Sequence, residues 1–322
     1  MRPQSLLQLL QSVQVQSLYP DEILIIDGST NQETAIILKE NPFQNLQYFA
    51  VPPEHRGLTK QRNFGVKKVG STMEVIAFLD DDTVLEKEYF KELINTFEEN
   101  QDVSGVGGVA INENGWSLAD PNAKYDSRRY YQFEGFVYKE GQRNVVRNYL
   151  GLQSNLGPGR MPDYSHSRTC GFPLNDSVQE VDLLIGLAFS FRKIVVETIQ
   201  FSSYFEGYGL YEDADFSIRA LQFGKNVINN KAQLKHFHHL SGRPNFYLYG
   251  KMVVRNGWYV WRIKNPKPIL KDKLKWHAIT ILLIGIRFIN TFTSNKKKEA
   301  FIEAVGRTVG WWGLLFDKPL RV

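Results

Sequence analysis

The chain has little cysteine and no long apolar segment. Its single cysteine, Cys170, excludes an internal disulfide and fits a reducing compartment. The N-terminus lacks a basic segment followed by an apolar one, so no signal peptide is expected. The longest apolar run of the C-terminal region, residues 278–286, is far short of the ~20 residues that span a bilayer, so a spanning helix is not indicated. We therefore expect a cytoplasmic protein, with the inner face of the cell membrane as a second option.

Acidic residues are scarce in the C-terminal region. Residues 251–298 contain twelve Lys and Arg but one acid, Asp272, a formal charge of +11, and the rest of the chain is −6 because the whole is +5. A basic segment beside an acidic body fits an anionic surface as partner. No nucleic-acid motif accompanies it, so no nucleic-acid partner is expected. A peripheral membrane contact, a homo-oligomer contact, a part of an acceptor site and plain helix packing all stay open for this segment.

The rest of the composition is that of a globular protein. The chain has 322 residues, 43% of them hydrophobic and 23% charged, which is enough for one large or two small domains with a sizeable core.

The first 110 residues alternate apolar strands with amphipathic helices. Strands are expected at 22–27, 46–51, 75–79 and 103–110. Helices are expected at 2–17, 34–40, 59–68 and 86–99. This alternation predicts an α/β fold with a parallel, doubly wound sheet.

The pattern changes after residue 110. Residues 112–178 have no sustained periodicity, which is typical of a functional loop region. Further on, helices are expected at 193–199 and from 211 to about 224, with short extended segments at 226–229 and 233–237. The chain from 246 onward looks helical, basic and aromatic.

Three adjacent acids stand at the centre of the sequence. The apolar run Val75-Ile76-Ala77-Phe78-Leu79 leads directly into Asp80, Asp81 and Asp82. Open α/β sheets bind their ligands at the carboxyl ends of such strands. The three carboxylates repel one another, and a hard divalent cation whose shell is completed by phosphates would neutralise them. A solvated acidic turn is the alternative.

Several segments, taken in order, resemble the family-2 glycosyltransferases, which are inverting, nucleotide-sugar-dependent enzymes of the GT-A fold. They cover about three quarters of the chain. The matching segments are EILIIDGS at 22–29, GLTKQRNFG at 57–65, FLDDDT at 78–83, GLAFSFR at 186–192, FEGYGLYEDAD at 205–215 and AQLKH at 232–236. One departure is that the family's usual first strand is absent before Arg2-Pro3. Either the true start lies upstream, or the protein binds its donor with a thinned wall.

The resemblance implies the fold and its division. It implies a GT-A-like, doubly wound mixed sheet over residues 1–245, with a Rossmann-like nucleotide-binding half at about 1–111 and an acceptor half at about 112–245. Residues 246–322 would form a basic, aromatic helical extension.

The resemblance also implies roles for the donor-site residues. Asp27, beside Gly28, would accept a hydrogen bond from the base, or it would only stabilise the following turn. Arg62, beside Asn63, would contact base or phosphate, or it would be a surface cation. Asp82 would bind Mn²⁺ or Mg²⁺, Asp80 would bind the metal or the ribose, and Asp81 would support the nucleotide side.

Three further positions complete the implied site. Asp213 is the candidate general base, with Glu212 as its competitor, although acids favour helix N-termini in any case. His236 would ligate the metal or contact the diphosphate, with His239 as the alternate.

The sequence thus predicts a metal-dependent glycosyltransferase. It would move a sugar from a UDP-, GDP- or dTDP-sugar to a saccharide or lipid-linked acceptor, with inversion, in surface polysaccharide synthesis. One alternative is a degenerate member that binds without turnover. Another is an aspartyl-phosphate phosphatase that uses Asp80, since residues 80–84 also satisfy that motif.

Overall fold

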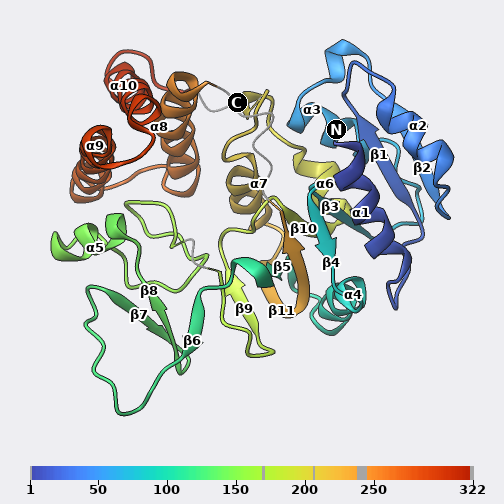
Figure 1. Cartoon of the computed structure of the whole chain (residues 1–322), viewed down its shortest axis with the longest axis horizontal. Helices are drawn as coiled ribbons and strands as arrows, with labels where there is room; N and C mark the ends of the chain where they lie inside the picture. Colours follow the sequence, from blue (N-terminus) through green and yellow to red (C-terminus); the bar gives the residue numbers. More distant parts are fainter. Residues whose placement is uncertain (1, 169–170, 206, 238–244, 320–322) are drawn as a thin grey trace. The chain divides into compact units, whose positions relative to one another are not determined.

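The structure is a computed structural model that describes residues 2–168, 171–205, 207–237 and 245–319 (Figure 1). The chain forms two compact units, and each is made of two separate stretches. The first unit comprises Met1–Asn114 and Leu174–Leu240, and the second comprises Gly115–Pro173 and Ser241–Val322. The domains predicted from sequence are consecutive stretches. The observed division differs in that residues 115–173 group with the C-terminal helices.

The central sheet of the first unit is mixed. Its strand order is β3-β10-β5-β11-β4, and β9 pairs with β11. Only β5 and β11 pair in parallel, and the other pairings of this sheet are antiparallel. The strands are β3 (Val75–Leu79), β4 (Thr83–Leu85), β5 (Val103–Ala110), β9 (Val178–Val181), β10 (Ala188–Arg192) and β11 (Lys225–His236). The purely parallel sheet predicted from the alternation is therefore wrong, whereas the GT-A-like mixed sheet is confirmed.

A second, two-stranded sheet belongs to the same unit. It pairs β1 (Ile23–Asp27) with β2 (Leu46–Ala50) in parallel. Between them runs α2 (Glu33–Glu40), and α3 (Leu58–Val66) packs on β1. The short η1 (Pro53–His55) separates β2 from α3.

The core of the first unit is formed by amphipathic helices packed on these strands. The helix α1 (Pro3–Gln14) buries its apolar face, made of Leu6, Leu9, Leu10 and Val13, as its spacing predicts. The helix α4 (Tyr89–Glu99) contributes Leu93 and Phe97 to the same core. The remaining elements are α6 (Lys193–Ile199), α7 (Glu212–Ala220), η2 (Ile111–Glu113) and η3 (Ser203–Phe205).

The second unit contains regular structure where the sequence predicts a long irregular region. A three-stranded antiparallel sheet has the order β6-β8-β7, with β6 (Trp116–Leu118), β7 (Tyr130–Phe133) and β8 (Phe136–Lys139). It is followed by α5 (Gln142–Tyr149). The strands have three or four residues each, which is too short for a periodic pattern in the sequence.

Three long helices form the C-terminal part of this unit. They are α8 (Phe246–Lys264), α9 (Leu270–Thr293) and α10 (Lys297–Gly313), and α10 packs against both others. The helix α9 has 24 residues and is long and apolar enough to cross a membrane, with 17% of its most apolar window buried. The uninterrupted apolar run at 278–286 is shorter than the helix, which continues on both sides of it from Leu270 to Thr293. The expectation from that run, that no spanning helix is indicated, therefore rested on too short a segment.

Candidate functional site

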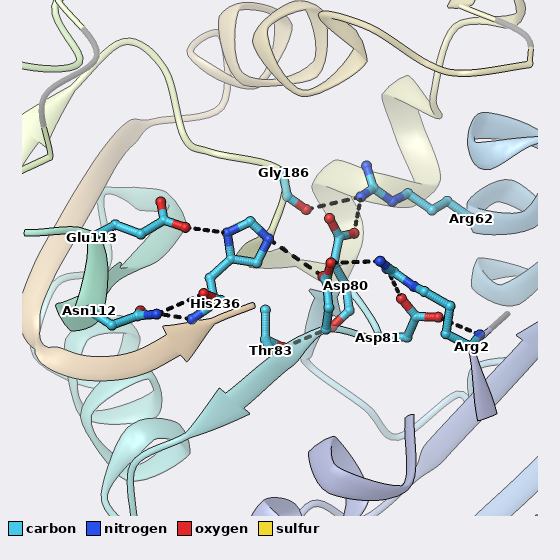
Figure 2. A network of polar contacts seen from close by, with 10 residues as sticks. Arg2, Arg62, Asp80, Asp81, Thr83, Asn112, Glu113, Gly186 and His236 are labelled. Atoms are coloured by element: carbon cyan, nitrogen blue, oxygen red, sulfur yellow. Dashed lines mark hydrogen bonds and ion pairs between the residues drawn. The ribbon is translucent and has the colours of Figure 1, made fainter. Parts of the chain in front are cut away.

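The acid triplet forms a tight turn between β3 and β4. The N–H and the hydroxyl of Thr83 both donate to the Asp80 carbonyl oxygen, at 3.2 and 2.8 Å (Figure 2). The Asp80 N–H donates to the Leu187 carbonyl oxygen at 2.8 Å. The strand therefore ends at Asp80. This break brings both Asp80 and Asp82 within electrostatic reach of His236, although alternate residues of a strand point in opposite directions.

Asp82 is buried and pairs with Arg2. Its Oδ2 accepts a hydrogen bond from Nη1 of Arg2 at 2.8 Å. Its Oδ1 is also buried and receives no hydrogen bond from the described residues, while Nε2 of His236 lies 3.5 Å away. Burial alone would raise the pKa of Asp82, but His236 and Arg2 hold it below its usual value. The carboxylate is therefore ionised at neutral pH.

Arg2 also contacts Asp81. Its backbone N–H donates to the Asp81 Oδ2 at 2.9 Å, and its guanidinium pairs with the Oδ1 of the same residue (Figure 2). Desolvation and the carboxylates of Asp81 and Asp82 raise the pKa of Asp80 to about 6, and Arg62 opposes them. One cation thus compensates two of the three acids directly.

His236 ends β11 and is held by the neighbouring strand end. Its Nδ1 lies 2.8 Å from Oε1 of Glu113. Its backbone N–H and carbonyl exchange hydrogen bonds with the Asn112 amide, at 2.9 and 2.8 Å (Figure 2). The Asp82 carboxylate, 3.5 Å from Nε2, raises the pKa of His236 above its ordinary value, although burial opposes it. The alternate, His239, lies outside the described residues.

Arg62 is buried inside the site, not on the surface. Its Nη1 lies 2.6 Å from Oε1 of Glu212, and its Nη2 donates to the Gly186 carbonyl oxygen at 3.1 Å. The Asp80 carboxylate is 3.6 Å from Nη2. Three aromatic rings lie 4.9–5.7 Å from the guanidinium carbon, those of Phe78, Phe189 and Phe201. This planar cation therefore joins the acid turn to the start of α7.

Glu212 and Asp213 open α7 but have different surroundings. Glu212 is 4% exposed, and desolvation raises its pKa to about 8 despite the Arg62 partner. Asp213 is only partly buried. Its Oδ2 accepts a hydrogen bond from the Gly186 N–H at 2.9 Å, and its Oδ1 accepts one from the Ala214 N–H at 2.8 Å. These bonds fix the Asp213 carboxylate beside the Gly186 segment.

Asp27 and its neighbours form a well-bonded turn at the end of β1. The Asp27 carboxylate is 1% exposed and accepts hydrogen bonds from the Ser29 N–H and the Tyr48 hydroxyl. Burial favours a higher pKa for Asp27, but these bonds hold it below its usual value. A Cβ on Gly28 would meet Oε1 of Gln61 at 2.7 Å. The turn therefore has a structural role in addition to any contact with a base.

Asn63 is engaged by the protein itself. Its amide nitrogen donates to the Phe201 carbonyl oxygen at 2.8 Å, and its amide oxygen accepts from the Phe201 N–H at the same distance. Phe201 belongs to the aromatic group around Arg62. Asn63 therefore positions a wall of the site.

The donor set fits a divalent metal that is shared with phosphates. Among the described residues, no group of three His, Cys, Asp or Glu side chains is arranged to hold an ion by itself. A Mg²⁺ or Mn²⁺ ion at a phosphate site needs only one or two carboxylates, with phosphate and water oxygens completing the shell. The buried Oδ1 of Asp82 is a carboxylate oxygen of this kind, and Asp80 and His236 lie beside it.

Sequence reasoning missed Arg2 and Glu113 as members of the site. Both are far from their partners along the chain, by 80 residues for Arg2–Asp82 and by 123 for Glu113–His236. One signal was present for Glu113. It ends η2, the short turn that follows β5. The strands β5 and β11 are parallel, and the carboxyl ends of parallel strands meet at one edge of a sheet.

The sequence of the chain is similar to those of known glycosyltransferases. Residues 1–151 match the sequence pattern of glycosyl transferase family 2. This match covers a little under half of the chain. A segment of 113 residues is 26% identical to the glucosyl-dolichyl phosphate glucuronosyltransferase of Haloferax volcanii. That segment is 34% of this chain and 34% of the relative, so the match spans about a third of that protein.

Two solved structures resemble the chain in fold. A mannosyltransferase of Pyrobaculum calidifontis in complex with GDP-Man and Mn²⁺ has a TM-score of 0.53 at 11% identity, over 97% of this chain and 84% of that one. The structure of GalNAc-T7 with UDP, GalNAc and Mn²⁺ has a TM-score of 0.51 at 14% identity, over 79% of this chain and 46% of that one. With the family match, they confirm the predicted GT-A fold.

Proposed function

We propose that this chain is a metal-dependent, inverting glycosyltransferase that moves a sugar from a nucleoside-diphosphate sugar to a saccharide or lipid-linked acceptor. The observation that carries the proposal is the buried Oδ1 of Asp82. It is an ionised carboxylate oxygen without a hydrogen bond from the described residues, next to Asp80 and His236 at the end of the central sheet. The family-2 match and the GT-A fold support the same function.

The donor site would be built around the acid turn. Asp82, with Asp80 and His236, would hold Mn²⁺ or Mg²⁺, and the bound metal would neutralise the leaving diphosphate. Asp27, Gly28 and Asp81 would lie on the nucleotide side. Arg62 and Asn63 would act there chiefly by positioning Glu212 and Phe201, given their contacts. The UDP and GDP-Man of the two similar structures make UDP and GDP the first nucleotides to try, and dTDP is the third.

Asp213 fits the general base better than Glu212. Glu212 is buried, paired with Arg62 and has a raised pKa, so its ionised form is disfavoured. Asp213 is partly open, and two backbone N–H groups hold its carboxylate. These bonds hold the carboxylate beside the Gly186 segment, where it could take the proton of an acceptor hydroxyl.

The transfer would be a single displacement. The acceptor hydroxyl oxygen forms a bond to the anomeric carbon, from the face opposite the diphosphate, as Asp213 takes the hydroxyl proton. The bond from the anomeric carbon to the phosphate oxygen breaks, and its electron pair leaves with the diphosphate. Attack from the opposite face inverts the anomeric configuration.

The acceptor class rests on the curated relative. Its name describes transfer of glucuronate to a glucosyl-dolichyl phosphate, which is a lipid-linked saccharide. We extend this class to the present chain and keep surface polysaccharide synthesis, in the cytoplasm, as its proposed context. The aspartyl-phosphate phosphatase alternative does not fit the family-2 match or the GT-A fold.

The first experiment is thermal denaturation of the full chain with UDP, GDP and dTDP, each with and without Mn²⁺. One nucleotide is expected to raise the melting temperature only with metal, because a ligand at a hundredfold excess over its dissociation constant adds about 2.7 kcal/mol of stability. Asp82→Asn should abolish this shift. Asp102→Asn is the matched control, since Asp102 pairs with Lys225 at the opposite end of β5 and is 60% exposed.

Turnover is tested next with sugars of the nucleotide that binds. Asp213→Asn should keep the metal-dependent shift but lower transfer by roughly 10²- to 10⁴-fold, the usual contribution of a general base. A metal-dependent shift without turnover of any sugar nucleotide would favour the binding-protein alternative. No shift with any nucleotide would overturn the proposed donor site.

A further inference from the structure

One face of α9 is apolar and exposed along its whole length. The exposed side chains are Leu270, Leu274, Ile281, Ile289 and Phe292, with exposed fractions from 49% to 80%. At 100° per residue they fall within an arc of about 100° on the helix. A helix of this length extends about 36 Å at 1.5 Å per residue. Exposed apolar surface of this extent is typical of an interaction site.

The opposite face of α9 packs against α8 and α10 within the second unit. Trp276 packs against the rings of Trp258 and Trp261, at 4.8 and 5.5 Å between centroids. Arg287 forms an ion pair with the buried Glu303 of α10. These contacts bind α9 to its neighbours along one side. The helix can therefore present its apolar face to a surface. If lipid surrounded it on all sides, the contacts of Trp276 and Arg287 would be lost.

The apolar face continues onto α10. Phe301, Val309 and Trp312 are exposed there, with Leu315 and Phe316 just beyond the helix. Phe288 of α9 contacts Phe301 of α10, with ring centroids 6.2 Å apart. The two exposed rows thus meet, and together they define the apolar face discussed below.

Basic side chains stand at both ends of this apolar face. Lys267, Lys271 and Lys273 are exposed near the start of α9, and residues 296–298, all Lys, are exposed at the start of α10. Between Lys275 and Lys296 the only charged residue is Arg287, which pairs with Glu303. An apolar stripe between cationic ends matches a bilayer surface with anionic headgroups, where apolar side chains enter the boundary region and Lys contacts phosphates.

We propose that the apolar face of α9 and α10 docks on the surface of a membrane containing anionic lipids, with α9 parallel to the bilayer plane. The charge distribution favours this occupant over a second copy of the chain, because two such faces would bring their exposed Lys side chains at 267, 271, 273 and 296–298 together and repel. The proposal does not depend on glycosyl transfer, since its readout is lipid binding.

Flotation of the full chain with vesicles tests the proposal. Vesicles of phosphatidylcholine with about a third phosphatidylglycerol should carry the protein, and vesicles of phosphatidylcholine alone should bind at least tenfold less. The triple variant Leu274→Ser, Ile281→Ser, Phe292→Ser should lose at least tenfold in binding. Replacement of the three Lys at 296–298 by Glu should abolish the preference for anionic vesicles.

The matched control removes equally exposed apolar side chains elsewhere. Ile36→Ser, Leu118→Ser, Ile194→Ser changes residues that are 54%, 75% and 62% exposed, and it should bind vesicles as the unaltered chain does. Equal loss in both triple variants would overturn the proposal. So would resistance of the bound protein to alkaline carbonate extraction, which indicates a spanning helix. A dimer in lipid-free solution that the α9 triple variant dissociates would assign this face to a second copy instead.

Discussion

At the scale of single residues, the Glu212 carboxyl lies between two opposing influences. Burial disfavours its charge, and Arg62 at 2.6 Å favours it. Desolvation is the larger effect and raises the pKa of Glu212 to about 8. A buried ion pair often fails to recover the cost of removing two charges from water, so this direction is physically reasonable.

This imbalance predicts a pH dependence of stability in the metal-free protein. The folded state holds the Glu212 proton more tightly than the unfolded state, whose pKa is about 4.5. The contribution of Glu212 to the free energy of unfolding is therefore complete below about pH 4.5, and it is lost as the pH rises through about 8. Glu212→Gln should flatten this fall, which is on the order of a few kcal/mol. Urea denaturation at pH 5, 6, 7 and 8, in the presence of a metal chelator, measures the free energy of unfolding of both proteins.

Glu98→Gln is the control for that series, because Glu98 is an exposed Glu of α4. Its profile should follow that of the unaltered chain. If Glu212→Gln also leaves the profile unchanged, then Glu212 is already ionised in the folded state and Arg62 outweighs the burial.

The sequence predicted the acid turn and His236 because each lies at the end of a recognisable strand. The triplet follows five apolar residues, and His236 ends an extended segment. It could not predict that Arg2 compensates Asp81 and Asp82, or that Arg62 is buried against Glu212. Those pairings join residues 79 to 150 positions apart, and only the folded chain brings them together.

At the scale of elements, α8 and α10 approach each other closely through glycine. A Cβ at Gly306 would overlap the Tyr247 carbonyl oxygen, and one at Gly250 would overlap the Glu303 carbonyl oxygen. Both obstacles are backbone atoms, which cannot rotate away. The close packing of α8 on α10 therefore requires the absence of these two side chains.

Gly306→Ala should lower the free energy of unfolding by about 1–3 kcal/mol, the usual cost of overpacking. The better helix propensity of Ala, worth about 1 kcal/mol, only partly offsets this. Gly285→Ala is the matched control, because a Cβ there meets nothing within 4 Å and should stabilise α9 slightly. Thermal denaturation compares the two. Equal effects would mean that α8 and α10 separate without cost.

Elements were predictable where periodicity was long enough. The strand at 103–110 and the helix at 193–199 were predicted with their observed bounds. Two short extended segments were predicted at 226–229 and 233–237, but they belong to one strand, β11 (Lys225–His236). The register with β5 shifts between Ile228 and Gln233, which interrupts the pattern in the sequence. The strands β6, β7 and β8 left no periodic signal, since their pairing and not their own sequence makes them a sheet.

At the scale of the whole molecule, the two units are interleaved along the chain. The first unit gives way to the second after Asn114, resumes at Leu174 and gives way again after Leu240. Sequence reasoning places boundaries between consecutive stretches, because composition shows where a pattern changes. It does not show that residues 115–173 pack with helices more than seventy positions later.

Contacts within the second unit explain that packing. The indole N–H of Trp261 donates to the Asp163 carbonyl oxygen at 2.7 Å. The Lys275 ammonium lies 4.2 Å from the centre of the Tyr164 ring. Trp261 is completely buried, so it also supplies apolar contact area. The C-terminal helices therefore act as the support for residues 115–173.

A chain that ends at Leu240 should keep the core of the first unit but lose the support of residues 115–173. In limited trypsin digestion, cleavage at Arg143 and Arg147 should become at least tenfold faster, because local unfolding exposes these bonds. The segment from α1 to β5 should resist cleavage as before, since its buried core lies in the first unit. Trp261→Phe in the full chain removes the hydrogen bond and keeps a ring, so its cleavage rate should be intermediate. Unchanged cleavage after the truncation would show that residues 115–173 are stable without α8, α9 and α10, and the linear division of domains would then describe the chain better.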